Sequence, residues 1–317
     1  MAAIARQILR ADADGTPEWK RQRTEGFGGS NASELYNGKK SRFQLWREKT
    51  GHAPEEYISP ELQALFDYGH SREPELARIF TDRTGWRVRN TGTWARKDDP
   101  WMLANPDRLV GSDGLLEIKT TGAYTDAAKE WNAGRVPAHA WVQAHWYAHV
   151  TGRRKLWFIA EVDRQPIVLG PYDADQDLLD DLDLEAREFW ALVTAGTEPA
   201  PTFPEDMPVA YPASTEGKVV EIDPWTDTVT DVERLAELKA QAKEIADEIK
   251  HLETGIKAEM GDAEALATTD GRVLVTWKSQ SRKGAIDMKA LAAEAGLDPE
   301  DYRKPSTTSR TFLVKGA

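Results

Sequence analysis

The chain has 317 residues, a net charge of −12, and 40% hydrophobic and 30% charged residues, a composition typical of a soluble globular protein. It contains no cysteine, which excludes disulfides, thiolate zinc sites, iron–sulfur clusters and cysteine nucleophiles. No run of about 18 apolar residues predicts a membrane span, and the first residues lack the apolar core of a secretion signal. We therefore expect a cytoplasmic protein, with any metal held by oxygen atoms or histidines.

The negative net charge at first argues against nucleic-acid binding, but phosphate binding needs only a local basic patch. Acidic residues are concentrated at residues 173–188. Basic clusters occur elsewhere, at Lys20-Arg21, Arg23, Lys39-Lys40, Arg42, Arg87, Arg89 and Arg153-Arg154-Lys155. Such clusters are usually solvated surface, so none of them alone predicts a contact with DNA.

The first two thirds of the chain alternate helical and extended patterns. We expect helices at residues 30–36, 43–50, 60–84, 138–151 and 175–195. Pro74 would lie at a first turn or kink of the third helix, and Gly152 would end the fourth. Strands are expected at residues 86–94, 101–110, 115–120, 156–162 and 167–170, with a turn at 111–114. This alternation predicts an α/β domain.

Five prolines within residues 196–212 rule out a helix and mark a boundary. We therefore predict a domain at 1–195, a proline-rich linker at 196–216 and a smaller α+β region at 217–317. That region contains a long helix at 229–260, whose apolar residues alternate at spacings of three and four: Leu235, Leu238, Ala242, Ile245, Ile249, Leu252 and Ile256. This heptad pattern favours oligomerisation or partner docking, and the alternative is an amphipathic helix lying on its own domain.

Residues 105–121, NPDRLVGSDGLLEIKTT, read as a β-hairpin. If residues 111–114 form the loop, counting back along the strand places Asp107 opposite Ile118 and close to Glu117. Pro106 restricts the backbone just before the acid. The hairpin therefore brings two carboxylates together from separate strands.

Glu117 and Lys119 are two residues apart and share one face of their strand, whereas Leu116 and Ile118 point to the opposite face and into a core. Two carboxylates and an ammonium group that converge in this way are costly to bury unless they bind something. Oxygen ligands suit Mg²⁺ or Mn²⁺, and the set fits metal-assisted hydrolysis of a phosphodiester. The alternative is a surface hairpin with a salt bridge.

This segment resembles the Pro-Asp…(Asp/Glu)-x-Lys nuclease motif, and the chain resembles the YqaJ-like viral recombinases, the family that includes the phage lambda exonuclease. The other segments that carry the resemblance are Trp19 and Arg23 with Gly28-Gly29-Ser30-Asn31, the run from Phe43 to Gly51, Gly69 with Glu73-Pro74, and the helix from Trp141-Val142-Gln143 through Tyr147 to Thr151-Gly152. The order holds from about residue 17 to 195. The resemblance implies a restriction-endonuclease-like core, a central mixed sheet flanked by helices.

The resemblance also implies roles for particular residues. Asp107 and Glu117 would bind the catalytic metal, with the Ile118 carbonyl as a further ligand. Lys119 would position or activate the attacking water. Glu73 would reach a second metal or its water shell; the alternative is an acid placed near a helix start, where the helix dipole favours it.

By the same resemblance, Gln143 would orient a water or a ligand, unless it is only a polar residue on an exposed helix face. Arg23 and Ser30 resemble the family's pocket for a terminal 5′ phosphate. Free backbone N–H groups around residues 28–30 and a forked guanidinium suit that ligand, and a simple turn with an N-cap is the alternative. Asn31 departs from the acid that many relatives carry, which weakens this assignment.

The histidines give weaker signals. His145 and His149 have a spacing that can hold zinc, but no glutamate lies at the general-base position and no third ligand is evident. His70 precedes Glu73 by three residues, and some related nucleases use a nearby histidine as a metal ligand. Asp113 stands at a turn, where Asp is common.

The function implied by the resemblance is a Mg²⁺-dependent exonuclease, with Mn²⁺ as the alternative metal, that digests linear double-stranded DNA from 5′ to 3′. The remaining 3′ single strand would pass to a phage single-strand annealing protein or recombinase, and the chain would form a homo-oligomer such as a trimer. One alternative is a structure-specific or restriction-type endonuclease on the same core. Another is a catalytically silent DNA-binding or assembly protein.

Overall fold

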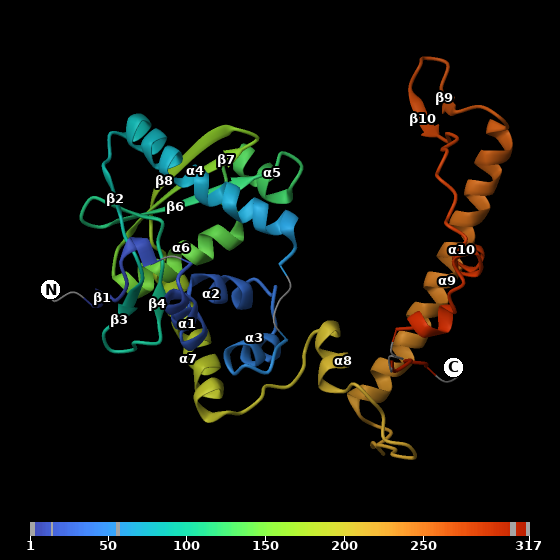
Figure 1. Ribbon diagram of the computed structural model, residues 1–317, viewed down its shortest axis with the longest axis horizontal. Helices are drawn as coiled ribbons and strands as arrows, with labels where there is room; N and C mark the ends of the chain where they lie inside the picture. Colours follow the sequence, from blue (N-terminus) through green and yellow to red (C-terminus); the bar gives the residue numbers. More distant parts are fainter. Residues whose placement is uncertain (1–3, 14, 55–57, 305–308, 315–317) are drawn as a thin grey trace. The chain divides into compact units, whose positions relative to one another are not determined.

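The computed structural model describes residues 4–13, 15–54, 58–304 and 309–314. The chain divides into two compact units, Met1–Ala210 and Tyr211–Ala317 (Figure 1). No helix in the described part of the chain is long and apolar enough to cross a membrane.

The first unit has alternating helices and strands, which confirms the predicted α/β class. Its helices are α1 (Pro17–Glu25), α2 (Gly29–Tyr36), α3 (Arg42–Lys49), α4 (Pro60–Thr84), α5 (Asp126–Asn132), α6 (Ala138–Thr151), α7 (Gln176–Ala195) and α8 (Met207–Ala210). Its strands are β1 (Ala5–Gln7), β2 (Val88–Asn90), β3 (Trp94–Arg96), β4 (Leu103–Ala104), β5 (Arg108–Val110), β6 (Gly114–Thr121), β7 (Lys155–Val162) and β8 (Gln165–Asp173).

The main sheet is mixed, as predicted. Its strand order is β2-β5-β6-β7-β8, with β6 and β7 parallel and the other neighbours antiparallel. Strand β7 is buried along nearly its whole length, which explains its continuous apolar run. Strands β1, β3 and β4 form a second, smaller sheet.

Helices cover both faces of the main sheet. One face is covered by α4 (Figure 1), whose Leu76 and Phe80 pack against Leu116 and Ile159. On the other face, α6 and α7 contribute to a larger core that also takes in Leu115 and residues of α2 and α3. Alternate residues of β6 therefore enter different cores, and the odd-numbered residues after Leu115 point towards α6.

Helix α4 begins and ends at the expected residues because the sequence caps both ends. The Ser59 side chain accepts a hydrogen bond from the Leu62 N–H, and Pro60 takes the first helical position. At the other end Gly85 adopts a left-handed φ of 76°. Pro74 lies inside the helix, which continues through it.

Two strands that were predicted as continuous are each broken, which corrects the sequence analysis. The first, at residues 86–94, divides into β2 and the start of β3, because the backbone at Gly92 approaches another segment so closely that a Cβ there would lie 2.2 Å from the Leu9 carbonyl oxygen. The second, at residues 101–110, divides into β4 and β5 around Pro106, which has no N–H to donate to a ladder. Asp107 is placed at this second break.

The hairpin register also differs by one residue from the prediction. Val110 pairs with Gly114 and Arg108 pairs with Leu116, so the turn contains three residues and Gly114 already belongs to β6. Gly111 has a φ of 53°, which allows the tighter turn. Continued by one residue, this register places Asp107 level with Glu117 rather than with Ile118.

Helices α1 and α5 were not predicted, although each carries a start signal. Thr16 and Thr125 act as N-caps, and Pro17 follows the first of them. Both helices are short, and the apolar periodicity that reveals longer helices is weak in them.

The second unit contains α9 (Asp227–Met260), the hairpin strands β9 (Ala265–Ala267) and β10 (Val273–Thr276), and α10 (Met288–Ala295). Among its described residues only Met260 is buried. The heptad residues Leu238, Ile245, Ile249 and Leu252 are 45–57% exposed. The middle of the apolar stripe of α9 is therefore exposed within this unit, whereas Leu235 and Ile256 towards its ends are partly buried.

The prediction that the proline-rich segment excludes a helix was wrong, because α8 lies within it and Pro208 falls in the first turn, where a proline is tolerated. The first unit continues past the predicted boundary at residue 195, because Asp206 holds the proline-rich segment against it. Asp206 is fully buried and accepts hydrogen bonds from the Ser41 hydroxyl at 3.0 Å and from the N–H groups of Thr202 and Phe203 at 2.9 Å each. Three donors satisfy a charge that burial would otherwise make costly.

We predict that Asp206→Ala lowers the free energy of unfolding by about 1–3 kcal/mol, because three donors lose their buried acceptor. Urea denaturation of the full chain measures this change. The neighbouring Glu205 is exposed, so Glu205→Ala should change stability by less than about 0.5 kcal/mol. Equal effects of the two substitutions would contradict the anchoring role.

Candidate active site

The structure brings Asp107, Glu117 and Lys119 together, as the hairpin predicted. All three line a cavity of about 430 Å³. Asp107 Oδ2 accepts a hydrogen bond from the Ile118 N–H at 2.6 Å, and Lys119 Nζ lies 2.7 Å from Glu117 Oε1. The backbone bond holds Asp107 against the neighbouring strand, although its own strand begins only at the next residue.

The two carboxylates lie in an unfavourable environment. Burial, together with the charge of Glu117, raises the pKa of Asp107 well above its usual value. Burial also raises the pKa of Glu117, and the nearby Lys119 only partly offsets this effect. Burial by itself would lower the pKa of Lys119, but the charges of Glu117 and Asp107 outweigh it and the pKa is raised. One ammonium group therefore does not neutralise this pair of acids.

The carboxylate pair fits a divalent cation. Glu117 is 2% exposed, and its Oε2 atom is buried without a hydrogen-bond partner among the described residues. An unsatisfied carboxylate oxygen beside a second acid is a suitable ligand for a hard cation such as Mg²⁺. No three His, Asp or Glu side chains form a ready metal cluster in the described ranges, so protein ligands would supply only part of the coordination shell.

Glu73 reaches the cavity from α4 but is held by an arginine. Its Oε2 atom accepts a hydrogen bond from Arg108 Nη1 at 3.3 Å, and the same nitrogen donates to the Asp107 carbonyl at 2.6 Å. Arg108 is 9% exposed. Arg108 was not among the predicted site residues, although its position directly after Asp107 and its pairing with β6 could have indicated it. His70 also lines the cavity.

Helix α6 contributes a hydrogen-bonded pair that supports Lys119. Lys119 Nζ donates to Gln143 Oε1 at 3.0 Å, and Gln143 Nε2 donates to the Tyr147 hydroxyl at 2.7 Å. Burial raises the pKa of Tyr147 well above its usual value. Gln143 therefore faces the cavity rather than an exposed surface. Tyr147 was not predicted as a site residue, although it lies four residues after Gln143 on the same helix face.

Glycine is required where α2 approaches α6. A Cβ at Gly29 would lie 2.5 Å from the Tyr147 ring and 3.0 Å from Gln143 Cγ. The absence of a side chain lets the start of α2 come close to the two residues that support Lys119.

Arg23 and Ser30 line a second cavity, of about 210 Å³, which we call the terminal pocket; its other lining residues include Lys49, Asn105 and Tyr147. The Arg23 guanidinium lies 4.6 Å from the centre of the Trp19 ring. Arg23 and Ser30 also line the catalytic cavity, so the two cavities adjoin.

Asn31 has a local structural role at the start of α2. Its side-chain oxygen accepts a hydrogen bond from the Gly28 N–H at 3.2 Å, as part of a capping box. An amide oxygen serves this role as an acid would, so the departure noted in the sequence does not alter the helix start.

Lys49 was not predicted and lies beside Arg23. Its Nζ donates to the carbonyls of Arg23 and Gly26 at 2.6 Å each. Burial and the Arg23 charge lower the pKa of Lys49 to about 7. Lys49 thus ties the end of α1 to α3 and fixes the backbone that carries Arg23.

Comparisons with known proteins identify the family of this chain. Residues 18–154 match the model of the YqaJ-like viral recombinase domain. The chain is 32% identical to the Bacillus subtilis protein YqaJ over 314 residues, which covers 94% of this chain and 93% of that protein. The chain belongs to the YqaJ-like viral recombinase family.

Similar solved structures include an alkaline exonuclease from Laribacter hongkongensis, with 21% identity, a TM-score of 0.48 and coverage of 58% of this chain and 95% of that chain. The same exonuclease in complex with dAMP has 23% identity and a TM-score of 0.49, at the same coverage. A phage-related exonuclease from Haemophilus somnus 129PT has 11% identity and a TM-score of 0.38, and covers 54% of this chain and 96% of that chain.

In this YqaJ-like chain the histidines of α6 do not form a metal pair. His145 is fully buried, with Nδ1 2.8 Å from the Trp141 carbonyl and Nε2 accepting from the Asp175 N–H at 3.1 Å. His149 instead lies 3.0 Å from Asp183. Each ring is therefore engaged with a different part of the protein.

We predict that Asp107→Asn stabilises the metal-free protein by about 0.5–2 kcal/mol, because it removes one of two repelling carboxylates. The folded state raises the pKa of Asp107 above its ordinary 3.8, so wild-type stability falls as pH rises through and above that value. Thermal melts in EDTA across this range should show a shallower decline for the variant.

The same thermal melts test whether a divalent cation binds between the two carboxylates. Mg²⁺ or Mn²⁺ should raise the melting temperature of the wild type and have little effect on Asp107→Asn. The exposed Asp98 gives a matched control, and Asp98→Asn should respond to the cation as the wild type does. Equal stabilisation of Asp107→Asn would argue against a cation between these carboxylates.

Proposed function

We propose that this protein is a Mg²⁺-dependent exonuclease that digests linear double-stranded DNA from 5′ to 3′, with Mn²⁺ as an alternative metal. The observation that carries the proposal is the buried pair Asp107–Glu117, with one unsatisfied oxygen, beside the Lys119 ammonium. Membership of a viral recombinase family and the likeness to proteins described as exonucleases agree with it.

Asp107, Glu117 and the Ile118 carbonyl would hold the cation, and Glu73 would turn from Arg108 towards it or its water shell. When bound, the cation supplies Lewis-acid stabilisation of the charge on the scissile phosphate and lowers the pKa of a water. The water oxygen forms a bond to phosphorus as the P–O3′ bond breaks. The leaving 3′ oxygen takes up a proton, which yields a 5′ mononucleotide and a shortened strand with a new 5′ phosphate.

Lys119 and Gln143 would orient the reacting groups. The Lys119 ammonium donates to phosphate or water oxygens that carry developing negative charge. Gln143 accepts from Lys119 Nζ and donates to Tyr147, which limits the orientations that the ammonium can take. Gln143 is therefore assigned as a positioning residue.

The terminal pocket supports the proposed 5′-to-3′ direction of digestion. The Arg23 guanidinium and the backbone N–H groups at the start of α2 suit a terminal phosphate. Because this pocket adjoins the catalytic cavity, a bound 5′ end would present the first phosphodiester bond to Lys119. The exposed stripe of α9 supports assembly with further copies or with an annealing protein or recombinase, which stays a prediction.

We predict that Lys119→Ala and Asp107→Ala each abolish digestion of linear duplex DNA in Mg²⁺ while DNA binding is retained. Gel assays with a radiolabelled duplex measure the first and fluorescence anisotropy measures the second. Lys129 is 72% exposed, and Lys129→Ala should digest normally. Retained digestion by either site variant would reject the assigned site, and cutting of closed circular DNA by the wild type would indicate an endonuclease.

We further predict that the wild type prefers duplexes with a 5′ phosphate and that Arg23→Ala loses this preference. The KM for phosphorylated ends should rise about tenfold or more, the effect of losing a hydrogen bond to a charged group. Arg21, on the same helix and 63% exposed, supplies the control, because Arg21→Ala should keep the preference. An unchanged preference in Arg23→Ala would exclude the terminal pocket as the phosphate site.

A further inference from the structure

Helix α9 is the long helix of the second unit (Figure 1), and it carries an apolar stripe whose middle is exposed. We call this stripe the α9 seam; its residues are Leu235, Leu238, Ala242, Ile245, Ile249, Leu252 and Ile256. With a rise of about 1.5 Å per residue, the seam is about 30 Å long. Continuous exposed apolar surface on a globular protein indicates a site of association.

The spacing of the seam residues is that of a helix that pairs with another helix. They alternate at intervals of three and four, so they occupy the core positions a and d of a heptad repeat. The a positions are Leu235, Ala242, Ile249 and Ile256, and the d positions are Leu238, Ile245 and Leu252. Because the a and d residues form the core of a coiled coil, the residues at positions e and g flank that core and determine which partner and which direction are favoured.

The residues that flank the seam have opposite charges in its two halves. In the first half they are Arg234 at position g and Lys239 at position e, and in the second half they are Glu248 at g and Glu253 at e. The flanking residues between these two groups are uncharged. The seam therefore has a basic border along its first half and an acidic border along its second half.

Contacts within the unit leave these flanking charges accessible. Arg234 pairs with Glu237 and Glu253 pairs with Lys257, in each case on the same helix, and the side chains of Arg234 and Glu253 remain 58% exposed. Lys239 and Glu248 are exposed as well. All four charges can therefore also meet charges on a second helix.

The order of the charges opposes a parallel arrangement of two or three copies of α9. In a parallel coiled coil, a g residue lies beside the e residue of the next heptad on the neighbouring helix. Arg234 would then meet Lys239 of a second copy, and Glu248 would meet Glu253 of that copy. Both contacts join like charges, which destabilises the pairing.

An antiparallel arrangement has the opposite effect, because e residues then face e residues and g residues face g residues. In the register that places Leu235 opposite Leu252 of the second copy, Lys239 meets Glu253 and Arg234 meets Glu248 of that copy.

We propose that α9 joins two copies of this chain as an antiparallel coiled coil with a twofold axis. The charge order selects a second copy as the occupant, because the seam is complementary to itself when it is reversed, as a twofold interface requires. In the same register Ala242 lies opposite Ile245 of the second copy, so a small residue faces a large one. This inference goes beyond the proposed function and does not depend on it.

Sedimentation equilibrium of the full chain over a series of concentrations tests the pairing. The mass of the wild type should rise with concentration towards an even number of chains. Ala242→Asp places a charge against Ile245 of the second copy and should raise the Kd of self-association about a hundredfold or more. Ala240 is exposed on the same helix, outside the seam and its flanks, so Ala240→Asp is a matched control that should associate as the wild type does.

Charge reversal in the same experiment tests the direction of the pair. Lys239→Glu places two acids together in the antiparallel pair and should raise the Kd about tenfold. In a parallel pair the new acid would instead meet Arg234 and lower the Kd. Adding Glu253→Lys to Lys239→Glu returns opposite charges to the antiparallel contact and should restore the wild-type Kd.

A wild type that stays monomeric at every concentration would overturn the proposal, since the seam would then be covered by the rest of the chain or by a different protein. Association that Ala242→Asp leaves unchanged, or that Lys239→Glu strengthens, would overturn it as well. These measurements do not depend on nuclease activity, so they test the pairing separately from the proposed function.

Discussion

The cost of burying two carboxylates with a single ammonium group governs the architecture of this site. Taking one unpaired ion out of water costs several kcal/mol even after the protein relaxes, and Asp107 and Glu117 share only Lys119 directly. The fold offsets part of this free-energy cost, because the Ile118 N–H donates a hydrogen bond to Asp107 and Gln143 holds Lys119 in place. The remaining unneutralised charge is the reason for proposing a bound cation, which a better neutralised pair would not need.

The packing of helices on both faces of the sheet determines which elements surround the two partly neutralised carboxylates. Strand β6 sends alternate residues into two cores, so Leu116 and Ile118 anchor it against α4 while Glu117 and Lys119 face α6. Helix α4 crosses the sheet and reaches the cavity through Glu73. Its position depends on apolar packing at one end and on the charged contacts with Glu161 near the other. The two kinds of contact constrain the helix more tightly than either could alone.

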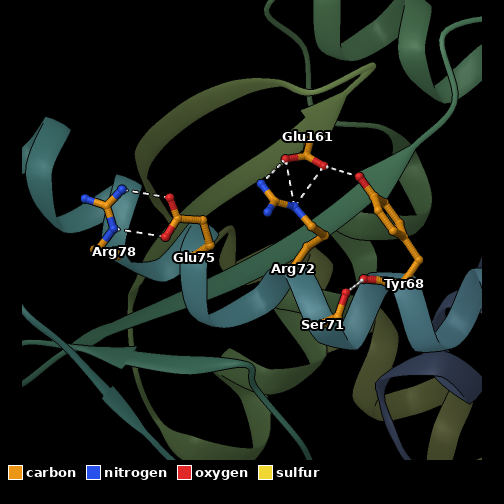
Figure 2. A network of polar contacts seen from close by, with 6 residues as sticks. All are labelled: Tyr68, Ser71, Arg72, Glu75, Arg78 and Glu161. Atoms are coloured by element: carbon orange, nitrogen blue, oxygen red, sulfur yellow. Dashed lines mark hydrogen bonds and ion pairs between the residues drawn. The ribbon is translucent and has the colours of Figure 1, made fainter.

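Arg108 and Arg72 each pair with a glutamate of this region, but with different hydrogen-bond geometry. Arg108 holds Glu73 by a single hydrogen bond of 3.3 Å, a weaker arrangement than the bidentate contact between Arg72 and Glu161. The weaker contact leaves Glu73 able to exchange partners, whereas the stronger one keeps the α4–β7 junction closed. The difference in hydrogen-bond geometry therefore distinguishes Glu73, which can move towards a ligand, from Glu161, which holds α4 against β7 (Figure 2).

The sequence by itself determined the features that depend on neighbouring residues. The caps of α4, the α/β alternation and the grouping of Asp107, Glu117 and Lys119 follow from short-range periodicity, turn residues and hairpin pairing. The breaks in two strands, the one-residue change of hairpin register and the partners Arg108, Tyr147 and Glu161 were decided only by the tertiary structure. These features depend on contacts between distant segments, such as Gly92 with residue 9 or Tyr68 with Glu161. Local patterns carry no information about which segments will meet, because that depends on how the helices and strands pack.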